Sequence, residues 1–396
     1  FFEWGAQGYA QDFRGYSFVR GHEYDNWRTE PLARVPDWAE TMLRRHPASM
    51  IYLRNVQHFR SEEDFFAPRV MAEACDWLEA NRRQPRFYLH IDSFDVHEPF
   101  HVPEPYRSLY TDDDYRRYTP WPPYGPAEAI GNDELAWVRA QFAGKLTMVD
   151  AHLGRVFDAL ERHDLWERTC VILTTDHGHY LGEHGWLGKP AAPLYRTLVH
   201  LPLMIWHPQG AHNAARIGAI TQTVDLHATA LELLGLAPRS GLHSRSLVPL
   251  LLGGAQEHRE AAVYGYCGER VGVSAGGWTL LREHDSSGGP AYWYSLNSDQ
   301  LFSRSFPMRH ARPKLPTPSA GRFVPGVSET HWRYEAPERA RTPAPPDLLF
   351  HDASDAEQTT DLSAARPEEV RRLEAILRRH LLELGAPPEQ GARLRL

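Results

Sequence analysis

VILTTDHGHYLGEHGWLGK, residues 171–189, is the stretch that decides the fold. Its β-branched opening, residues 171–175, predicts a buried strand that ends at Asp176, His177 and Gly178. Open α/β sheets place their chemistry just beyond the carboxyl ends of their strands. We therefore expect Asp176 and His177 at such an end, with Gly178 giving the backbone freedom to turn.

The loop after this strand carries many cationic or metal-ligating side chains, namely His177, His179, His184 and Lys189. Such groups repel one another unless a metal or an anion lies among them. A lone Asp-His pair after a strand could instead be a helix cap next to a surface histidine. The density of the cluster favours a site for a metal, an anion or both.

The segments on either side of this loop alternate between helix and strand, as in α/β folds. Apolar residues at helical spacing predict helices over residues 68–83 and 133–163. Apolar runs predict strands over 86–94 and 200–206. A capping signal at Thr223 or Asp225 opens a helix that ends near Leu236. We assign residues 1–258 to an α/β catalytic domain.

Residues 259–396 have a different pattern and are assigned to a smaller C-terminal α+β subdomain. Antiparallel strands are predicted over 262–267, 271–283 and 291–297, with glycine-rich turns between them. A segment dense in proline and arginine, residues 305–346, has no periodicity and is interpreted as an extended or partly disordered insertion. An amphipathic helix is predicted over residues 367–384.

Two further segments could border a pocket. Residues 119–126, TPWPPYGP, form a stiff loop with aromatic faces, either a wall of a substrate pocket or a rigid surface crossover. Residues 20–25, RGHEYD, are expected to form an exposed loop.

Composition favours a soluble globular enzyme. The chain has 396 residues, of which 42% are hydrophobic and 24% are charged, as in an ordinary globular protein. A net charge of −8 argues against nucleic acid as a partner, and the chain contains no apolar stretch long enough to cross a membrane. Three scattered cysteines make no disulfide framework, which favours a cytoplasmic location.

Several motifs, in the expected order, resemble those of the sulfatases in the alkaline phosphatase superfamily. The resemblance begins with FYLHIDSFDVHEPF at 87–100 and VPEPY at 102–106. It continues with TDHG at 175–178, LGEHG at 181–185 and GK at 188–189, and it closes with LLFHD at 348–352 and DAEQ at 355–358. Val96 stands where the family usually has proline. The resemblance implies an alkaline-phosphatase-like mixed sheet flanked by helices, with a smaller C-terminal domain of antiparallel sheet and helix.

The resemblance also implies roles for individual residues. Asp176 and His177 match metal ligands, His97 matches a histidine that binds sulfate and protonates the leaving alcohol, and Lys189 matches a lysine that contacts sulfate and the leaving oxygen. Ca²⁺ is the expected ion, with Mn²⁺ or Mg²⁺ as alternatives. We assign Asp95 and His184 to substrate binding, with a structural role as the alternative for both.

The nucleophile of the family does not match a suitable position in these 396 residues. Sulfatases carry a Cys/Ser-x-Pro-x-Arg motif near the N-terminus, whose first residue becomes formylglycine, after two metal-binding aspartates. A formal match at Ser305-Phe306-Pro307-Met308-Arg309 lies in the proline-rich segment and is not taken as the nucleophile. We expect an N-terminally truncated chain, inactive by itself, with its formylglycine upstream of Phe1.

The motifs are compatible with three functions. The first is metal-dependent hydrolysis of a small-molecule or carbohydrate sulfate ester. The second is a phosphonate monoester or phosphodiester hydrolase of the same superfamily, whose Asp-His-Gly loop looks almost the same. The third belongs to another class: a pseudoenzyme that binds sulfated glycans without cleaving them.

Overall fold

The computed structural model describes residues 12–113, 118–189, 193–238, 241–266, 268–295, 317–319, 331–336 and 346–396. The chain divides into two compact units. The first unit comprises residues 1–169 and 179–190, and the second comprises residues 170–178 and 191–396. The Ser305 motif lies outside the described residues, as does most of the predicted insertion at 305–346.

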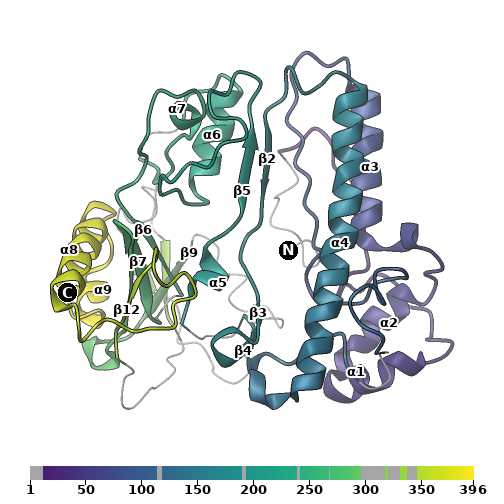
Figure 1. Cartoon of the computed structure of the whole chain (residues 1–396), viewed down its shortest axis with the longest axis horizontal. Coiled ribbons are helices and arrows are strands. Elements are labelled where there is room, and N and C mark those ends of the chain that lie inside the picture. Colours follow the sequence, from purple (N-terminus) through teal and green to yellow (C-terminus); the bar gives the residue numbers. More distant parts are fainter. Residues whose placement is uncertain are drawn as a thin grey trace. The chain divides into compact units, whose positions relative to one another are not determined.

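Most of the regular secondary structure of the first unit is helical. They are α1 (Glu40–Arg45), α2 (Met50–Val56), α3 (Phe66–Asn81) and α4 (Asn132–Arg162), with short 3₁₀ turns at Asp37–Ala39, Pro47–Ser49, Glu62–Asp64 and Ala127–Ala129. The long helices α3 and α4 lie side by side (Figure 1). Both were predicted from apolar spacing, and both begin and end within about two residues of the predicted bounds.

Two apolar clusters hold these helices in place. The first joins α1, α2 and the start of α3, through Met42, Leu53, Phe66 and their neighbours. The second surrounds the middle of the first unit, where the turn residue Phe100 and the α4 residues Trp137 and Val138 are almost wholly buried. Burying each such side chain contributes roughly 1.5–3 kcal/mol. The second cluster anchors the turn that precedes Phe100.

A three-stranded antiparallel sheet completes the first unit, with strand order β1-β4-β3. Its strands are β1 (Gly125–Pro126), β3 (Tyr180–Leu181) and β4 (Trp186–Gly188). The strands are too short to be stable by hydrogen bonds alone. Their stability comes from burial, since Tyr180 and Leu187 have no exposed surface.

In the second unit, the predicted strand at 171–175 is present as β2 (Val171–Thr174). It pairs antiparallel with β5 (Leu203–Trp206) in a two-stranded ladder. The segment after residue 190 adds the short helices α5 (Arg196–Val199), α6 (Asp225–Leu233) and α7 (Val248–Leu251). The side chains of β2 are half-buried rather than fully buried, because only one neighbouring strand is present among the described residues.

The C-terminal part of the second unit is a four-stranded antiparallel sheet of order β12-β8-β7-β6. Its strands are β6 (Ala262–Gly265), β7 (Val271–Ala275), β8 (Trp278–Arg282) and β12 (Leu348–His351). The helix α8 (Pro367–Glu383) packs its apolar stripe on this sheet, and α9 (Pro388–Arg393) follows it. A second sheet has the order β10-β11-β9, formed by Thr317–Ser319, His331–Glu335 and Tyr292–Ser295. The predicted antiparallel sheet with a terminal helix is thereby confirmed.

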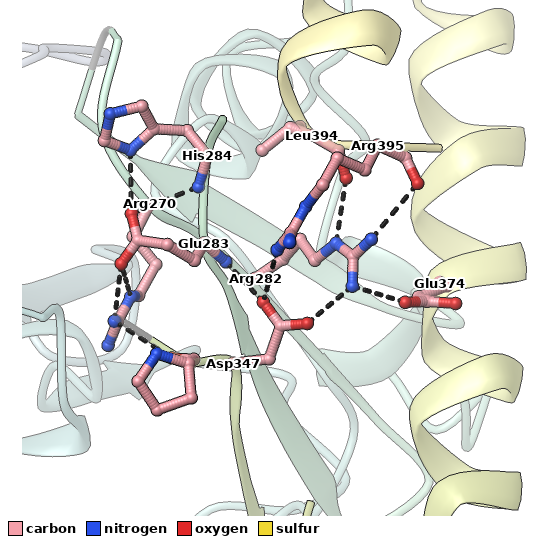
Figure 2. A network of polar contacts seen from close by, with 9 residues as sticks. Arg270, Arg282, Glu283, His284, Asp347, Glu374, Leu394 and Arg395 are labelled. Carbon is pink, nitrogen blue, oxygen red and sulfur yellow. Dashed lines mark hydrogen bonds and ion pairs between the residues drawn. The ribbon is translucent and has the colours of Figure 1, made fainter. Parts of the chain in front are cut away.

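A network of ion pairs joins this sheet to the end of the chain (Figure 2). Arg282, at the end of β8, pairs with Asp347 before β12 and with Glu374 on α8. Its guanidinium also donates to the carbonyl oxygens of Leu394 (2.8 Å) and Arg395 (3.1 Å). All four contacts depend on one side chain that is 9% exposed. Arg282 therefore ties the sheet, α8 and the C-terminus together.

Three predictions about local structure were wrong. Residues 86–94 form no hydrogen-bonded strand, because no described strand of the first unit pairs with them. The strand predicted over 271–283 is a hairpin, since Gly276 and Gly277 adopt positive φ and turn the chain between β7 and β8. The loop at 20–25 is not wholly exposed, because Asp25 is buried and accepts hydrogen bonds from Gly21 and Arg20.

The domain boundary at residue 258 stays a prediction. Among the described residues, no helix combines the length and the apolar character that a membrane crossing requires.

We predict that Arg282→Met destabilises the second unit by about 3 kcal/mol, because it leaves Asp347 and Glu374 without their shared cation and two carbonyls without a donor. Urea unfolding followed by circular dichroism measures the change. Arg371→Met is the matched control, because Arg371 is exposed on α8 and its substitution removes the same positive charge. Equal stability of the two variants would contradict the role of Arg282.

Candidate active site

The turn at residues 94–100 carries His97 and is held at both ends. The backbone N–H of His97 donates to the carbonyl oxygen of Phe94 at 3.0 Å. The backbone N–H of Phe100 donates to the carbonyl oxygen of Pro120 at 2.7 Å. Because Phe100 itself is fully buried, the turn is anchored in the apolar core of the first unit.

A buried ion pair fixes the same turn from beneath. The Lys145 ammonium, in the middle of α4, lies 2.6 Å from Asp95 Oδ1. It also donates to the carbonyl oxygens of His97 at 2.6 Å and Pro99 at 2.9 Å. A lysine has three protons to donate, and here each has an acceptor on the turn.

Asp95 is equally well satisfied. Its Oδ1 accepts a hydrogen bond from His22 Nε2 at 3.0 Å, and its Oδ2 accepts one from the backbone N–H of Ala67 in the first turn of α3 at 3.0 Å. Burial alone would raise the pKa of Asp95, but Lys145 and His22 hold that pKa well below its usual range. Asp95 is therefore an ionised, buried anchor between α3, α4 and the turn. Substrate binding by Asp95 stays a prediction, and these contacts favour its structural alternative.

Two carboxylates lie near one nitrogen of the His97 ring. Its Nδ1 is 2.8 Å from the carbonyl oxygen of Glu98, so Nδ1 carries a proton and Nε2 is left with a lone pair. The carboxylates of Glu98 and Glu23 lie 3.4 Å and 3.5 Å from the same nitrogen. Burial, with a smaller contribution from the charge of Lys189, lowers the pKa of His97 to about 4, although Glu98 opposes the change.

Lys189 follows β4 in the same unit. Its ammonium lies 6.0 Å from the centroid of the Tyr124 ring, and its charge acts on both His97 and Glu98. His97 and Lys189 come from distant motifs of the sequence. Both belong to the first unit, and the charge of Lys189 acts on the His97 ring.

Two histidines of the 171–189 segment, His179 and His184, belong to the first unit and occupy different parts of it. His179 directly precedes β3, and its Nδ1 lies 3.8 Å from Glu98 Oε2. His184 instead lies in the turn between β3 and β4, with a φ of +52°. Its substrate-binding role stays a prediction.

Asp176 and His177 follow β2 in the second unit. Asp176 Oδ1 accepts the backbone N–H of His177 at 2.8 Å. His177 Nδ1 lies 2.9 Å from the carbonyl oxygen of Gly178, which leaves Nε2 unprotonated and 3.4 Å from Asp176 Oδ2. Gly178 is required here because a Cβ atom would lie 1.9 Å from the carbonyl oxygen of Thr197.

This pair fits two adjacent ligands of a divalent ion. Ligand atoms that bind one ion at ~2.0–2.6 Å lie about 3–3.5 Å from each other. A backbone acceptor on the other ring nitrogen is the usual way to orient a ligating histidine. Within the part of the chain that the structure describes, no three His, Cys, Asp or Glu side chains are grouped to hold a metal. The role of Asp176 and His177 as metal ligands stays a prediction.

Sequence reasoning missed His22, Glu98 and Lys145. Lys145 falls on the buried face of α4, where an apolar residue was expected, and that position is a signal that could have been used. His22 and Glu98 carry no such signal, since neither residue belongs to a periodic pattern.

Comparison with known proteins gives the family. The family model described as sulfatase matches residues 6–236, more than half of the chain. The multifunctional alkaline phosphatase superfamily protein PehA of Trinickia caryophylli is 28% identical over 224 residues, 49% of this chain and 42% of the relative. An N-acetylglucosamine-6-O-sulfatase of Bacteroides thetaiotaomicron is 29% identical over 150 residues, 36% of this chain and 26% of the relative. The chain spans less than half the length of these curated relatives.

Solved structures share the fold. A putative sulfatase from Bacteroides fragilis superposes with a TM-score of 0.57 at 16% identity, covering 83% of this chain and 61% of the other. A phosphonate monoester hydrolase of Agrobacterium radiobacter gives a TM-score of 0.53 at 21% identity, covering 82% and 61%. The predicted fold class is confirmed. With its motifs, its fold and its match over residues 6–236, this chain belongs to the sulfatase family of the alkaline phosphatase superfamily.

Proposed function

We propose that the protein hydrolyses a sulfate ester with the help of a divalent metal. The observation that carries this proposal is the cluster around Glu98, in which the family's leaving-group histidine and lysine, His97 and Lys189, act on one carboxylate. Membership of the sulfatase family supports the same reaction. The formylglycine nucleophile stays a prediction from the family motif.

His97 is suited to protonate the leaving oxygen. When the S–O bond of the ester breaks, its electron pair goes to the alcohol oxygen, and a proton from His97 Nε2 neutralises it. Nδ1 is held by the carbonyl of Glu98, so only Nε2 is available for this transfer. A sulfate ester is an anion, and its approach raises the pKa of His97, which is depressed to about 4 in the free protein.

Lys189 supplies a point charge to the same step. Charge develops on the leaving oxygen and redistributes over the sulfuryl oxygens as the bond breaks. A preorganised ammonium stabilises that state more than the ground state. The half-buried position of Lys189 keeps its charge from being screened fully by water.

Asp176 and His177 would hold the metal. A divalent ion there supplies a positive charge for sulfuryl oxygens and for the deprotonated nucleophile. One carboxylate oxygen and one imidazole nitrogen are compatible with Ca²⁺, Mn²⁺ or Mg²⁺, and we propose Ca²⁺ on the family pattern. Among the described residues, no third His, Cys, Asp or Glu side chain is grouped with Asp176 and His177 to hold a metal.

The substrate is proposed to be a sulfated carbohydrate or another small sulfate ester. The N-acetylglucosamine-6-O-sulfatase relative supports the carbohydrate, and an arylsulfatase K of Gallus gallus, 32% identical over 124 residues, supports an aryl ester. A phosphonate monoester or phosphodiester is the second candidate, because one relative, aligned over 224 residues, is a multifunctional member of the superfamily.

We predict that the protein expressed from its complete gene cleaves 4-nitrophenyl sulfate at least about 10-fold faster, in kcat/KM, than 4-nitrophenyl phenylphosphonate, which corresponds to ~1.4 kcal/mol of transition-state preference. Release of nitrophenolate measures both rates. A preference for the phosphonate would replace the first function with the second. Sulfated-glycan binding without turnover of either ester would favour the pseudoenzyme.

The metal assignment predicts that Asp176→Ala and His177→Ala each lower the bound metal content by at least about 10-fold, because each removes one direct ligand. Elemental analysis after dialysis against trace calcium measures the content without reference to turnover. His227→Ala is the control, since His227 is exposed in the same unit and is not one of the proposed metal ligands. Wild-type metal content in both variants would contradict the assignment of Asp176 and His177 as metal ligands.

The two leaving-group roles predict different substrate dependences. His97→Ala should lower kcat by roughly 10²–10⁴-fold on an alkyl or sugar sulfate, whose alcohol leaves poorly, and far less on 4-nitrophenyl sulfate. Lys189→Ala should slow both substrates, because its charge also faces sulfuryl oxygens. If His97→Ala lowered kcat equally on both esters, His97 would bind sulfate but would not protonate the leaving oxygen.

A further inference from the structure

Three side chains meet at one end of the β1-β4-β3 sheet. In the antiparallel register, Gly125 is opposite Leu187, and Tyr180 is opposite Gly188. Tyr124 precedes β1, His179 precedes β3 and Lys189 follows β4. The register therefore places these three residues at the same end of the sheet, although the sequence separates Tyr124 widely from the other two.

Glu98 meets this end of the sheet from the His97 turn. Its side chain is 1% exposed. Oε1 accepts a hydrogen bond from the Tyr124 hydroxyl, and Oε2 lies 3.4 Å from His97 Nδ1. Burial alone would raise the pKa of Glu98, but His97, His179 and Lys189 lower it, and the Tyr124 hydroxyl adds to the effect. Glu98 is thus a buried carboxylate kept ionised by the groups around it.

Tyr124 connects this carboxylate to the strand that carries Lys189. Its ring lies against Gly188, where a Cβ atom would be 2.4 Å from Tyr124 Cδ1. Gly188 has a φ of +76°, so both space and backbone conformation require glycine there. The same ring lies 6.0 Å from the Lys189 ammonium. One tyrosine therefore touches the backbone before Lys189 with its ring and the carboxylate beside His97 with its hydroxyl.

We propose that Glu98 and Tyr124 are a positioning pair, which holds His97 and Lys189 in register for work on one leaving oxygen. This inference rests on the proposed function, because Glu98 and Tyr124 are assigned to position the two side chains that the proposed function makes catalytic. The Glu98 carboxylate stabilises the imidazolium form of His97, which is the form that can donate a proton. Tyr124 holds that carboxylate in place and packs beneath Lys189.

Burying the Glu98 charge is costly unless polar groups surround it. A carboxylate that is 1% exposed needs donors or cations around it; here the Tyr124 hydroxyl donates to Oε1, and Oε2 faces the rings of His97 and His179. Replacing the tyrosine hydroxyl leaves Oε1 without its donor while the ring keeps its packing on Gly188. The chemistry of the pair can therefore be changed without disturbing the fold of the sheet.

The test is a double-mutant cycle of Tyr124→Phe and Glu98→Gln in the protein expressed from its complete gene, with kcat and KM measured on a sugar sulfate and on 4-nitrophenyl sulfate. Each single variant should lose roughly 10–100-fold in kcat on the sugar sulfate, as when a supporting residue of a catalytic group is removed, with little change in KM. The double variant should be no slower than Glu98→Gln alone, because the Tyr124 hydroxyl acts through Glu98.

Matched controls separate positioning from folding. Tyr110→Phe removes a hydroxyl that bonds to Thr147 at 2.9 Å on the exposed surface of the same unit, and Glu128→Gln removes an exposed carboxylate just after β1. Both should retain wild-type kcat. The losses in Tyr124→Phe and Glu98→Gln should shrink on 4-nitrophenyl sulfate, a dependence that a purely structural role would not produce.

A second readout does not require turnover. Because Glu98 favours the charged ring, Glu98→Gln should lower the pKa of His97, followed by NMR of the imidazole with saturating inorganic sulfate. Multiplicative losses in the cycle, or an unchanged His97 titration in Glu98→Gln, would overturn the positioning pair. If the protein prefers a phosphonate ester, the proposed function fails, whereas the cycle, run on that ester, still decides the pair.

Discussion

The buried ion pair between Lys145 and Asp95 is the contact on which the candidate active site depends. Taking both charges out of water is costly, and the cost is offset only because every proton of the ammonium and both carboxylate oxygens have partners. Those partners belong to α3, α4, His22 and the turn that carries His97. The turn cannot move relative to the two long helices without leaving a charge unpaired in the core. The ion pair therefore fixes the backbone of His97, and the His97 side chain takes no part in that ion pair.

Lys189 is held by a different kind of constraint. The β1-β4-β3 sheet has few ladder hydrogen bonds, and its position depends on the burial of Tyr180 and Leu187 and on the contact of the Tyr124 ring with Gly188. A long, flexible lysine gains precision when the backbone just before it is packed tightly. The same packing brings the Tyr124 hydroxyl to Glu98. The two proposed catalytic side chains thus share one carboxylate although they come from distant parts of the sequence.

Asp176 and His177 illustrate a local solution. Their geometry needs only the end of β2, the carbonyl oxygen of Gly178 and a glycine that can approach Thr197 closely. Everything that orients the pair lies within a few residues or on the neighbouring segment. The C-terminal sheet is built in the opposite way, since Arg282 joins residues that lie far apart in the chain (Figure 2). A site whose contacts lie within a few residues can be recognised as a sequence motif, whereas a network that joins distant residues cannot.

The sequence alone determined the family, the α/β class, the helices α3, α4 and α8, and the strand that ends before Asp176, because each depends on periodicity or on a contiguous motif. It failed at residues 86–94, where strand propensity found no partner strand among the described residues of the first unit. Tertiary structure decided that His179 and Lys189 lie together at one end of a sheet whereas His184 lies in the intervening turn. It also decided that Lys145 and Glu98 belong to the site. The physical reason is that a buried charge is recognised by its partners, and those partners are brought to it only by the packing of the whole unit.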